Sequence, residues 1–182
     1  MKTYIALLRG INVSGHKIIK MQLLRDVLLQ IGFHNVSTYI QSGNVIFQTN
    51  LLDKKIIENE IASCIQKHFG HEVPVIVITP EELKSVIERN PHHQESLDPA
   101  QPYVAFLSEK PSPLLLKTLQ KMDFKGDTFV NQDATLYLHY AQSAADTKLT
   151  NAVIERMLQI KSTTRNWKTV LQLMILVDQT TT

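Results

Sequence analysis

The stretch Val36-Ser-Thr-Tyr-Ile-Gln-Ser-Gly-Asn-Val-Ile-Phe47 decides the fold, because it predicts a β-hairpin in the middle of the first half of the chain. Residues 36–40 and 45–47 are rich in side chains that favour strands. They are joined by residues 41–44, Gln-Ser-Gly-Asn, in which glycine supplies the positive φ of a tight turn. The hairpin therefore predicts two antiparallel neighbours in a sheet.

The segments on either side of the hairpin extend this prediction to a lobe. Residues 4–8 form a short apolar run, and residues 21–31 carry apolar side chains at helical spacing before Gly32. After the hairpin, residues 53–69 show one apolar helical stripe and residues 73–78 form another apolar run. The order strand, helix, strand, strand, helix, strand predicts an α+β fold with a ferredoxin-like βαββαβ N-terminal lobe.

The second half repeats this pattern only in part. Residues 103–107, Tyr-Val-Ala-Phe-Leu, are similar to residues 4–8, Tyr-Ile-Ala-Leu-Leu. The elements expected from there on are a strand at 103–107, a helix at 113–122, strands at 128–130 and 136–140, and helices at 148–158 and 166–177. A true copy would end in a strand, so both an internal duplication and a chance similarity stay open.

The sequence therefore predicts two domains. Residues 1–90 form the ferredoxin-like lobe with a connecting helix, and residues 91–182 form a related but rearranged βαββαα lobe packed on the first and ending in two helices.

Composition is that of an ordinary globular protein, with 43% hydrophobic and 20% charged residues. No apolar run approaches the roughly 18 residues of a membrane span, and the N-terminus lacks a signal-peptide pattern, so we expect a cytoplasmic protein. A single cysteine, Cys64, excludes internal disulfides and multi-cysteine metal sites, and the histidines lack zinc spacing. We expect no metal and no cofactor. The net charge of +2 neither proposes nor excludes nucleic acid.

Three segments carry cations where an anion would be favoured. Residues 9–17, Arg-Gly-Ile-Asn-Val-Ser-Gly-His-Lys, form a glycine-bounded loop, although His16 stands where a nucleoside-triphosphatase loop needs lysine. Lys148 and Arg165 each follow capping residues at a predicted helix start, where the helix dipole disfavours a cation unless an anion binds. Ordinary turns and helix starts with solvated bases are the alternative in each case.

Candidates for catalysis are few. Cys64 and Trp167 lie on apolar helical stripes, which is typical of core residues. Ser42 lies in the hairpin turn without the context of a nucleophile elbow, and His139 lies on a strand face where an exposed polar residue is equally expected. No catalytic residue is assigned. Residues 39–47 lack the signature of an RNA-recognition module.

Five segments in this order resemble the domain-of-unknown-function family 1697, with Ser14 where that family more often has glycine. The segments are Ala6-Leu-Leu-Arg-Gly-Ile-Asn-Val13, Thr38-Tyr-Ile-Gln-Ser-Gly-Asn-Val45, Tyr137-Leu-His-Tyr140, Thr147-Lys-Leu-Thr150 and Thr164-Arg-Asn-Trp-Lys-Thr169. The resemblance implies a bacterial cytosolic protein and brings no established activity, substrate or catalytic residue.

Polar residues of these segments and of the glycine-bounded loop are our candidate ligand-binding residues. They are Arg9, Asn12, Lys17, Gln41, Ser42, Asn44, Lys148, Arg165 and Asn166. We hypothesise that they converge on one polar cleft between the lobes and bind a small anionic ligand, phosphorylated or nucleotide-like. The alternatives are an enzyme acting on such a ligand through Ser42 or His139, and a nucleic-acid or protein interaction module. A membrane partner is not expected, and the oligomeric state is not predicted.

Overall fold

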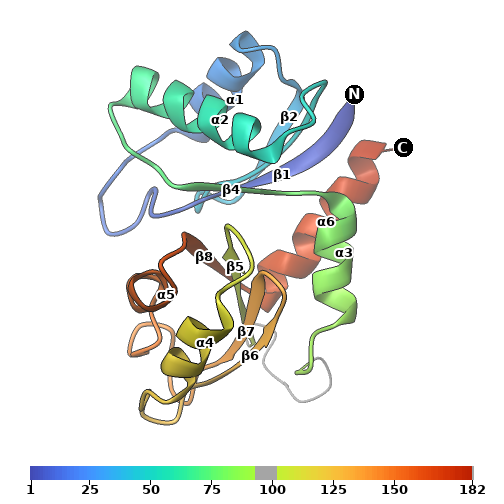
Figure 1. Cartoon of the computed structure of the whole chain (residues 1–182). Helices are drawn as coiled ribbons and strands as arrows, with labels where there is room; N and C mark the ends of the chain where they lie inside the picture. The colour runs from blue at the N-terminus through green and yellow to red at the C-terminus, as the bar shows by residue number, and fades with distance from the viewer. Residues whose placement is uncertain (93–101, 182) are drawn as a thin grey trace. The chain divides into compact units, whose positions relative to one another are not determined.

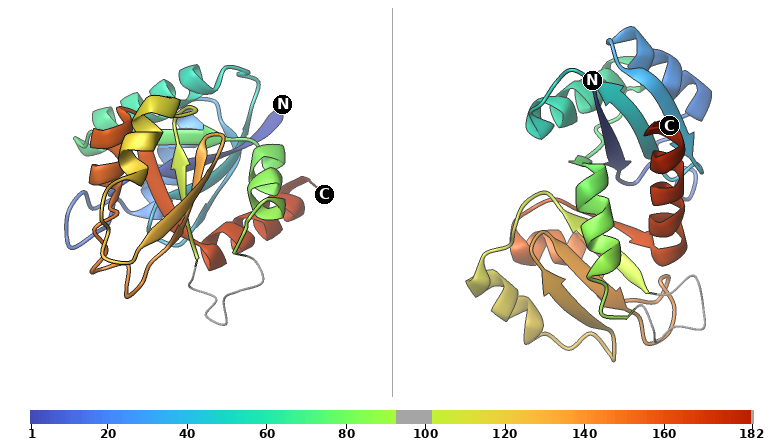
Figure 2. Two further views of the ribbon diagram at one scale, coloured as in Figure 1. Left: turned by 60° about the horizontal axis from the view of Figure 1, so that its bottom comes forward. Right: turned by 90° about the vertical axis from the view of Figure 1, so that its right-hand side faces the viewer.

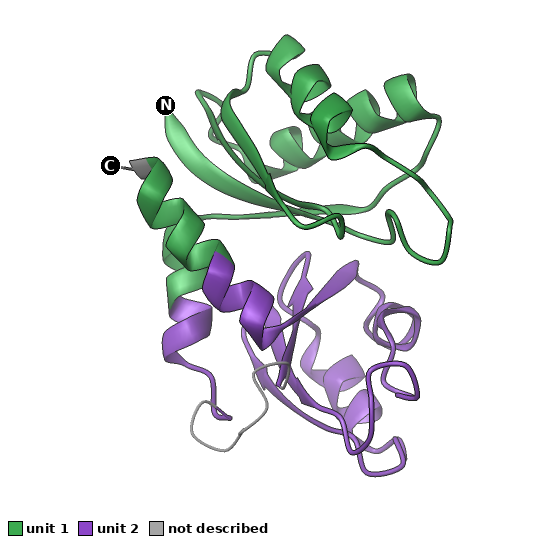
Figure 3. Ribbon diagram, turned by 180° about the vertical axis from the view of Figure 1, so that it is seen from behind, with its two compact units in different colours: residues 1–84, 173–182 green, residues 85–172 purple. Residues whose placement is uncertain are grey.

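The computed structural model describes residues 1–92 and 102–181. Within these residues it contains two four-stranded antiparallel sheets and six helices (Figure 1). The predicted α+β class is confirmed. The chain divides into two compact units, which are unit 1 with residues 1–84 and 173–182, and unit 2 with residues 85–172 (Figure 3). The domain boundary between residues 90 and 91 stays a prediction.

Unit 1 contains the six elements predicted for the first lobe, in the predicted order. They are β1 (Lys2–Leu8), α1 (Met21–Gln30), β2 (His34–Tyr39), β3 (Asn44–Thr49), α2 (Lys54–Phe69) and β4 (Val75–Ile78). The strands lie in the order β2-β3-β1-β4, and each is antiparallel to its neighbours. Both helices cover the same face of the sheet (Figures 1 and 2). The unit 1 core is formed by side chains of the helices and of this face of the sheet.

Helix α2 is bounded by a capping residue at each end and has one buried face. Asp53 caps it by accepting hydrogen bonds from the backbone N–H groups of Lys55 and Ile56, and Gly70 ends it with a left-handed φ of 71°. The side chains on its inner face are buried in the core, among them Ile61 and the predicted core residue Cys64. Burial raises the pKa of the Cys64 thiol, which makes it less reactive.

Unit 2 has the same succession of elements. They are β5 (Tyr103–Leu107), α4 (Pro113–Gln120), β6 (Thr128–Gln132), β7 (Thr135–His139), α5 (Asn151–Leu158) and β8 (Ser162–Asn166). The strand order β6-β7-β5-β8 corresponds position by position to that of unit 1, and all neighbours are again antiparallel. The remaining helices, α3 (Pro80–Glu88) and α6 (Trp167–Thr181), each contain residues of both units.

Strand β8 corrects the predicted βαββαα pattern of the second half. Thr163 and Thr164, the residues that precede Arg165 at the predicted helix start, pair with Phe106 and Ala105 of β5, as β-branched residues in a strand do. The cap of α6 is Asn166, whose side-chain oxygen accepts a hydrogen bond of 2.8 Å from the backbone N–H of Thr169. The βαββαβ succession of the second half is therefore completed by a strand, as in the first half, before helix α6 begins.

Backbone hydrogen bonds at matching strand ends strengthen the correspondence between the units. In unit 1, Leu8 N donates to Gly43 O at 2.8 Å, and in unit 2, Leu107 N donates to Ala134 O at 2.9 Å. Just beyond them, Arg9 N donates to Pro74 O at 3.0 Å and Ser108 N donates to Lys161 O at 2.9 Å. Matching topology and matching end contacts favour an internal duplication over a chance similarity of two strands.

Candidate functional site

Two connections differ in length between the corresponding units. From the first strand to the first helix, the chain runs over residues 9–20 in unit 1 and over residues 108–112 in unit 2. From the third strand to the second helix, it runs over residues 50–53 in unit 1 and over residues 140–150 in unit 2. The shorter connection in each pair joins the same two elements, so the longer one exceeds the length that the connection itself needs. Long loops on a rigid scaffold commonly carry binding residues.

Loop 9–20 is held in place by the side chain of Asn12. Its amide nitrogen donates to Ile19 O at 3.0 Å and to Gln41 O at 2.9 Å, and its oxygen accepts from Ile19 N at 2.8 Å. These bonds close the loop on itself and tie it to the hairpin turn. The ammonium of Lys17 donates to the backbone carbonyl of Glu72, which anchors the middle of the loop. Two predicted site residues thus have structural contacts within unit 1.

The hairpin turn is fixed by Asn44, another predicted site residue. Its buried side chain donates to Tyr39 O at 3.1 Å and to the Ser42 hydroxyl at 3.2 Å. The backbone carbonyl of Gly43, the residue before Asn44, accepts the hydrogen bond from Leu8 N that joins the turn to β1. Loop 9–20 and the turn therefore form one rigid end of unit 1, with Arg9 half-buried at its base.

Replacing Asn12 by alanine is expected to lower the free energy of unfolding by about 2 kcal/mol, since side-chain hydrogen bonds contribute about 1 kcal/mol each and alanine disfavours a positive φ. Asn12 has a φ of 53°. The matched control is Asn35→Ala, because Asn35 has a φ of 50° but makes one side-chain bond, to Gln48. Urea denaturation measures both variants. Equal losses would show that Asn12 does not hold the loop.

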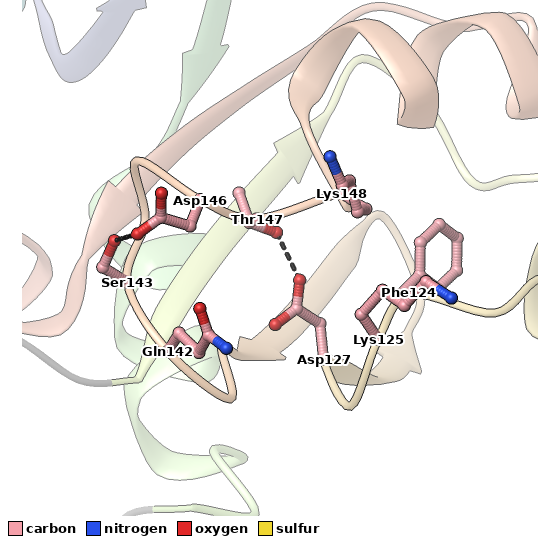
Figure 4. Close-up of a pocket in the computed structure, with 8 residues that line it drawn as sticks. All are labelled: Phe124, Lys125, Asp127, Gln142, Ser143, Asp146, Thr147 and Lys148. Atoms are coloured by element: carbon pink, nitrogen blue, oxygen red, sulfur yellow. Dashed lines mark hydrogen bonds between the residues drawn. The ribbon is translucent and has the colours of Figure 1, made fainter.

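Loop 140–150 is held by a residue outside it, Asp127, which lies just before β6. The carboxylate accepts hydrogen bonds of 2.6 Å from the Thr147 hydroxyl and 2.9 Å from Ala141 N, and the nearby backbone N–H groups of Lys148 and Leu149 also stabilise its charge. Burial alone would raise the pKa of Asp127, but these bonds outweigh it and lower the pKa below its usual value. The ionised carboxylate therefore fixes the loop at neutral pH (Figure 4).

A hollow of about 310 Å³ lies between loop 140–150 and the turn before β6 (Figure 4). It is lined by Phe124, Lys125, Asp127, Gln142, Ser143, Asp146, Thr147 and Lys148. All of these residues belong to unit 2. The volume is at the low end of the roughly 300–1,000 Å³ of small-molecule sites, so the hollow suits a small ligand.

The charged side chains that line this hollow differ in the contacts that they already make with other residues. Asp146 accepts a 2.6 Å hydrogen bond from the Ser143 hydroxyl, and Lys125 forms a 3.2 Å ion pair with the exposed Asp123. Lys148 is exposed, and within residues 1–92 and 102–181 its ammonium forms no ion pair. The predicted site residue Lys148 is therefore the cation that this hollow offers to a ligand.

Arg165 and Asn166 occupy a different environment from the one predicted. Arg165 lies in strand β8 and not at the start of a helix, and its buried guanidinium donates to Thr163 Oγ1 at 2.8 Å and to Thr164 O at 2.9 Å. Burial lowers the pKa of Arg165 to about 10, which leaves it charged at neutral pH. Asn166 caps α6, and Trp167 is buried as predicted. None of the three lines the hollow.

The structure brings the predicted residues of unit 1 together around loop 9–20 and the hairpin turn, and it places Lys148 in the hollow of unit 2. Their convergence on one cleft stays a prediction. His139 is exposed at the end of β7, with its ring centroid 6.0 Å from that of His92, and it does not line the hollow. In the described part of the chain, no three His, Cys, Asp or Glu side chains are grouped as metal ligands.

Sequence reasoning missed Asp127, Gln142, Ser143 and Asp146. The available signal was the length and small polar composition of residues 140–150, which exceed what a strand-to-helix connection needs. Asp127 had no local signal, because its partners lie 14 and 20 residues further along the chain.

A family model described as "Protein of unknown function (DUF1697)" matches residues 1–137. The chain belongs to this family. The resemblance to DUF1697 is thus confirmed, and the matched part contains the whole of unit 1 up to residue 84, with loop 9–20 and the hairpin. Loop 140–150 and strand β8 lie beyond the matched residues.

Among solved structures, this DUF1697 chain is similar to "conserved bacterial protein SP0830 from Streptococcus pneumoniae", with a TM-score of 0.72 and 22% sequence identity. The similarity covers 98% of this chain and 99% of the other, so the two share a fold along nearly their whole length. The search of curated proteins found no match. Among the described helices, none has the length and apolar character needed to cross a membrane.

Proposed function

We propose that this protein binds a small anionic ligand, phosphorylated or nucleotide-like, with the anionic group of the ligand at Lys148. The observation that carries the proposal is the hollow beside loop 140–150, which combines the ammonium of Lys148, without an ion pair among the described residues, with a backbone held by Asp127. A site that is already ordered loses little conformational entropy when the ligand binds.

The electrostatics of the hollow support an anion at this position. An ammonium-to-phosphate hydrogen bond is charge-assisted and stronger than a neutral one. The carboxylate of Asp127, which lies outside the loop, accepts hydrogen bonds from the Thr147 hydroxyl and Ala141 N, and the backbone N–H groups of Lys148 and Leu149 also stabilise its charge. A phosphate at Lys148 therefore meets less repulsion than the formal charges suggest.

Loop 9–20 of unit 1 is a separate candidate site within the proposal, considered apart from the hollow of unit 2. It is enlarged relative to its counterpart in unit 2, and the contacts of Asn12 and Lys17 give it a fixed conformation. Within the proposal, Arg9 supplies the positive charge of this loop, and the other candidates of unit 1, Asn12, Gln41, Ser42 and Asn44, orient a ligand there. Arg165 and Asn166 do not line the hollow, because their side chains serve strand β8 and the cap of α6.

Thermal unfolding in the presence of inorganic phosphate, nucleotides and phosphorylated metabolites tests the proposal. A ligand present at 100 times its Kd stabilises a protein by about 2.7 kcal/mol, which corresponds to a shift of roughly 5–10 °C at this size. Lys148→Ala is expected to weaken binding about tenfold or more, because a charge-assisted hydrogen bond is lost.

The matched control is Lys117→Ala, which removes an exposed lysine of α4 in the same unit that does not line the hollow. This variant is expected to bind as the wild type does. A ligand that binds both variants equally would place the anion site elsewhere and overturn the assignment to Lys148.

A further inference from the structure

We infer that the ligand of this hollow is a phosphorylated polyol of about monosaccharide size, a sugar phosphate, and not a nucleotide. The inference rests on the proposed function and names the chemical class of its ligand. It follows from three features of the lining, which are the groups beside Lys148, the position of the aromatic ring and the balance of charge.

Two groups that line the hollow beside Lys148, Asp146 and Gln142, are suited to hydroxyls. One oxygen of Asp146 accepts the bond from Ser143, and the other has no hydrogen-bond partner in the described part of the chain. The exposed amide of Gln142 likewise makes no hydrogen bond there, and it offers both a donor and an acceptor. A carboxylate oxygen beside an amide can bind neighbouring hydroxyls, but it repels a phosphate.

These groups give the hollow two chemically different ends. Figure 4 shows Asp146 and Lys148 to either side of Thr147. A ligand with hydroxyls at one end and a phosphate at the other satisfies both. Inorganic phosphate alone would use the Lys148 end and leave the Asp146 end without a partner.

The lining does not offer a surface for a nucleobase. Bases are commonly held by stacking on aromatic rings, which contributes about 1–3 kcal/mol per base. The aromatic residue of the lining is Phe124, which is 6% exposed and belongs to the unit 2 core. The Phe124 ring packs edge to face against the ring of Phe129, with 6.4 Å between the ring centroids. Because it is buried in this packing, it does not present a free face to a ligand.

Charge balance disfavours polyphosphates. The lining contains two lysines and two aspartates, and Lys125 is already paired with Asp123. The ammonium of Lys148 can therefore bind one phosphate group of a ligand. A triphosphate would bring additional negative charge close to Asp146 and Asp127 without further cations to neutralise it.

Calorimetric titration of the full chain with triose, pentose and hexose phosphates, AMP, ATP, inorganic phosphate and the unphosphorylated sugars tests the inference. We expect one of the sugar phosphates to bind at least tenfold more tightly than AMP, inorganic phosphate or its own parent sugar. Asp146→Asn is expected to weaken that sugar phosphate about tenfold while inorganic phosphate binds within twofold of wild type. The control Asp123→Asn is expected to change neither Kd.

The outcomes separate this inference from the proposed function. Binding of AMP or ATP as tight as that of any sugar phosphate would overturn the inference and leave the anionic-ligand proposal standing. An unchanged sugar phosphate Kd in Asp146→Asn, with the thermal midpoint of wild type, would remove the hydroxyl-binding role. Failure of every phosphorylated probe to bind would overturn both.

Discussion

Replacing Gly43 by alanine is expected to lower the free energy of unfolding by about 3 kcal/mol, because a left-handed φ costs a non-glycine residue about 1–2 kcal/mol and overpacking a core costs about 1–3 kcal/mol. Gly43 has a φ of +84°, and a Cβ built on it would lie 2.7 Å from Leu8 Cβ and 3.0 Å from Ile11 Cδ1. Both neighbours are fully buried and cannot move aside without disturbing β1 and loop 9–20. Urea denaturation measures the loss.

Gly15→Ala is the matched control for this prediction. Gly15 has a similar φ of +78°, but a Cβ there would meet nothing within 4 Å. It therefore pays the conformational cost without the clash, and we expect a loss of about 1 kcal/mol. Losses of the same size in both variants would contradict the close approach of the hairpin turn to β1.

Asp127→Ala is expected to lower the free energy of unfolding by about 2 kcal/mol, since it removes charged acceptors from donors that then lose their partners. The amides of Ala141 and Leu149 should also exchange with solvent much faster, because Ala141 N donates to this carboxylate and Leu149 N donates to the Thr147 hydroxyl that the carboxylate holds. Hydrogen exchange followed by NMR measures the second effect. Asp123→Ala removes a nearby carboxylate that contacts only Lys125 within the described residues, and it should leave these amides protected.

The effect of Asp127→Ala is expected to depend on pH in a defined direction. The pKa of Asp127 is lowered in the folded protein, so its contribution is fully present above the unfolded-state pKa of about 3.9 and is lost as the pH falls through the folded pKa. The difference in stability between wild type and Asp127→Ala should therefore shrink when denaturation is measured below about pH 4. A difference that stays constant down to pH 2 would contradict the role of the ionised carboxylate.

The first lobe could be predicted because its signals are local. The hairpin turn is set by Gly43 with its positive φ, and α2 is bounded by Asp53 and Gly70. Strand β8 could not be recognised in the same way. Its residues, Ser-Thr-Thr-Arg-Asn, lack apolar alternation, and serine and threonine are equally typical of helix caps. Pairing with β5 decides its conformation, and that partner lies far away in the sequence.

The candidate site was predictable only in part, for a related reason. Lys148 is predicted at the start of a helix over 148–158, but α5 begins at Asn151 with Thr150 as its cap, so Lys148 lies in the loop before the helix. Asp127 gave no local signal, because its function depends on the folded loop that it holds. Asn12 and Asn44 were selected as polar residues that packing does not ordinarily require, yet both make hydrogen bonds that build the unit 1 loop and turn. Local chemistry thus indicated the right loops more reliably than the roles of single residues.

The proposal that loop 140–150 binds an anion at Lys148 is tested most directly by locating the bound ligand. Amide NMR spectra of the wild type, titrated with inorganic phosphate and with sugar phosphates, would report the site residue by residue. We expect the largest shifts at residues 142–148, saturating with the calorimetric Kd and requiring about tenfold more ligand or beyond in Lys148→Ala. Shifts confined to residues outside this loop, or undiminished in that variant, would contradict the account.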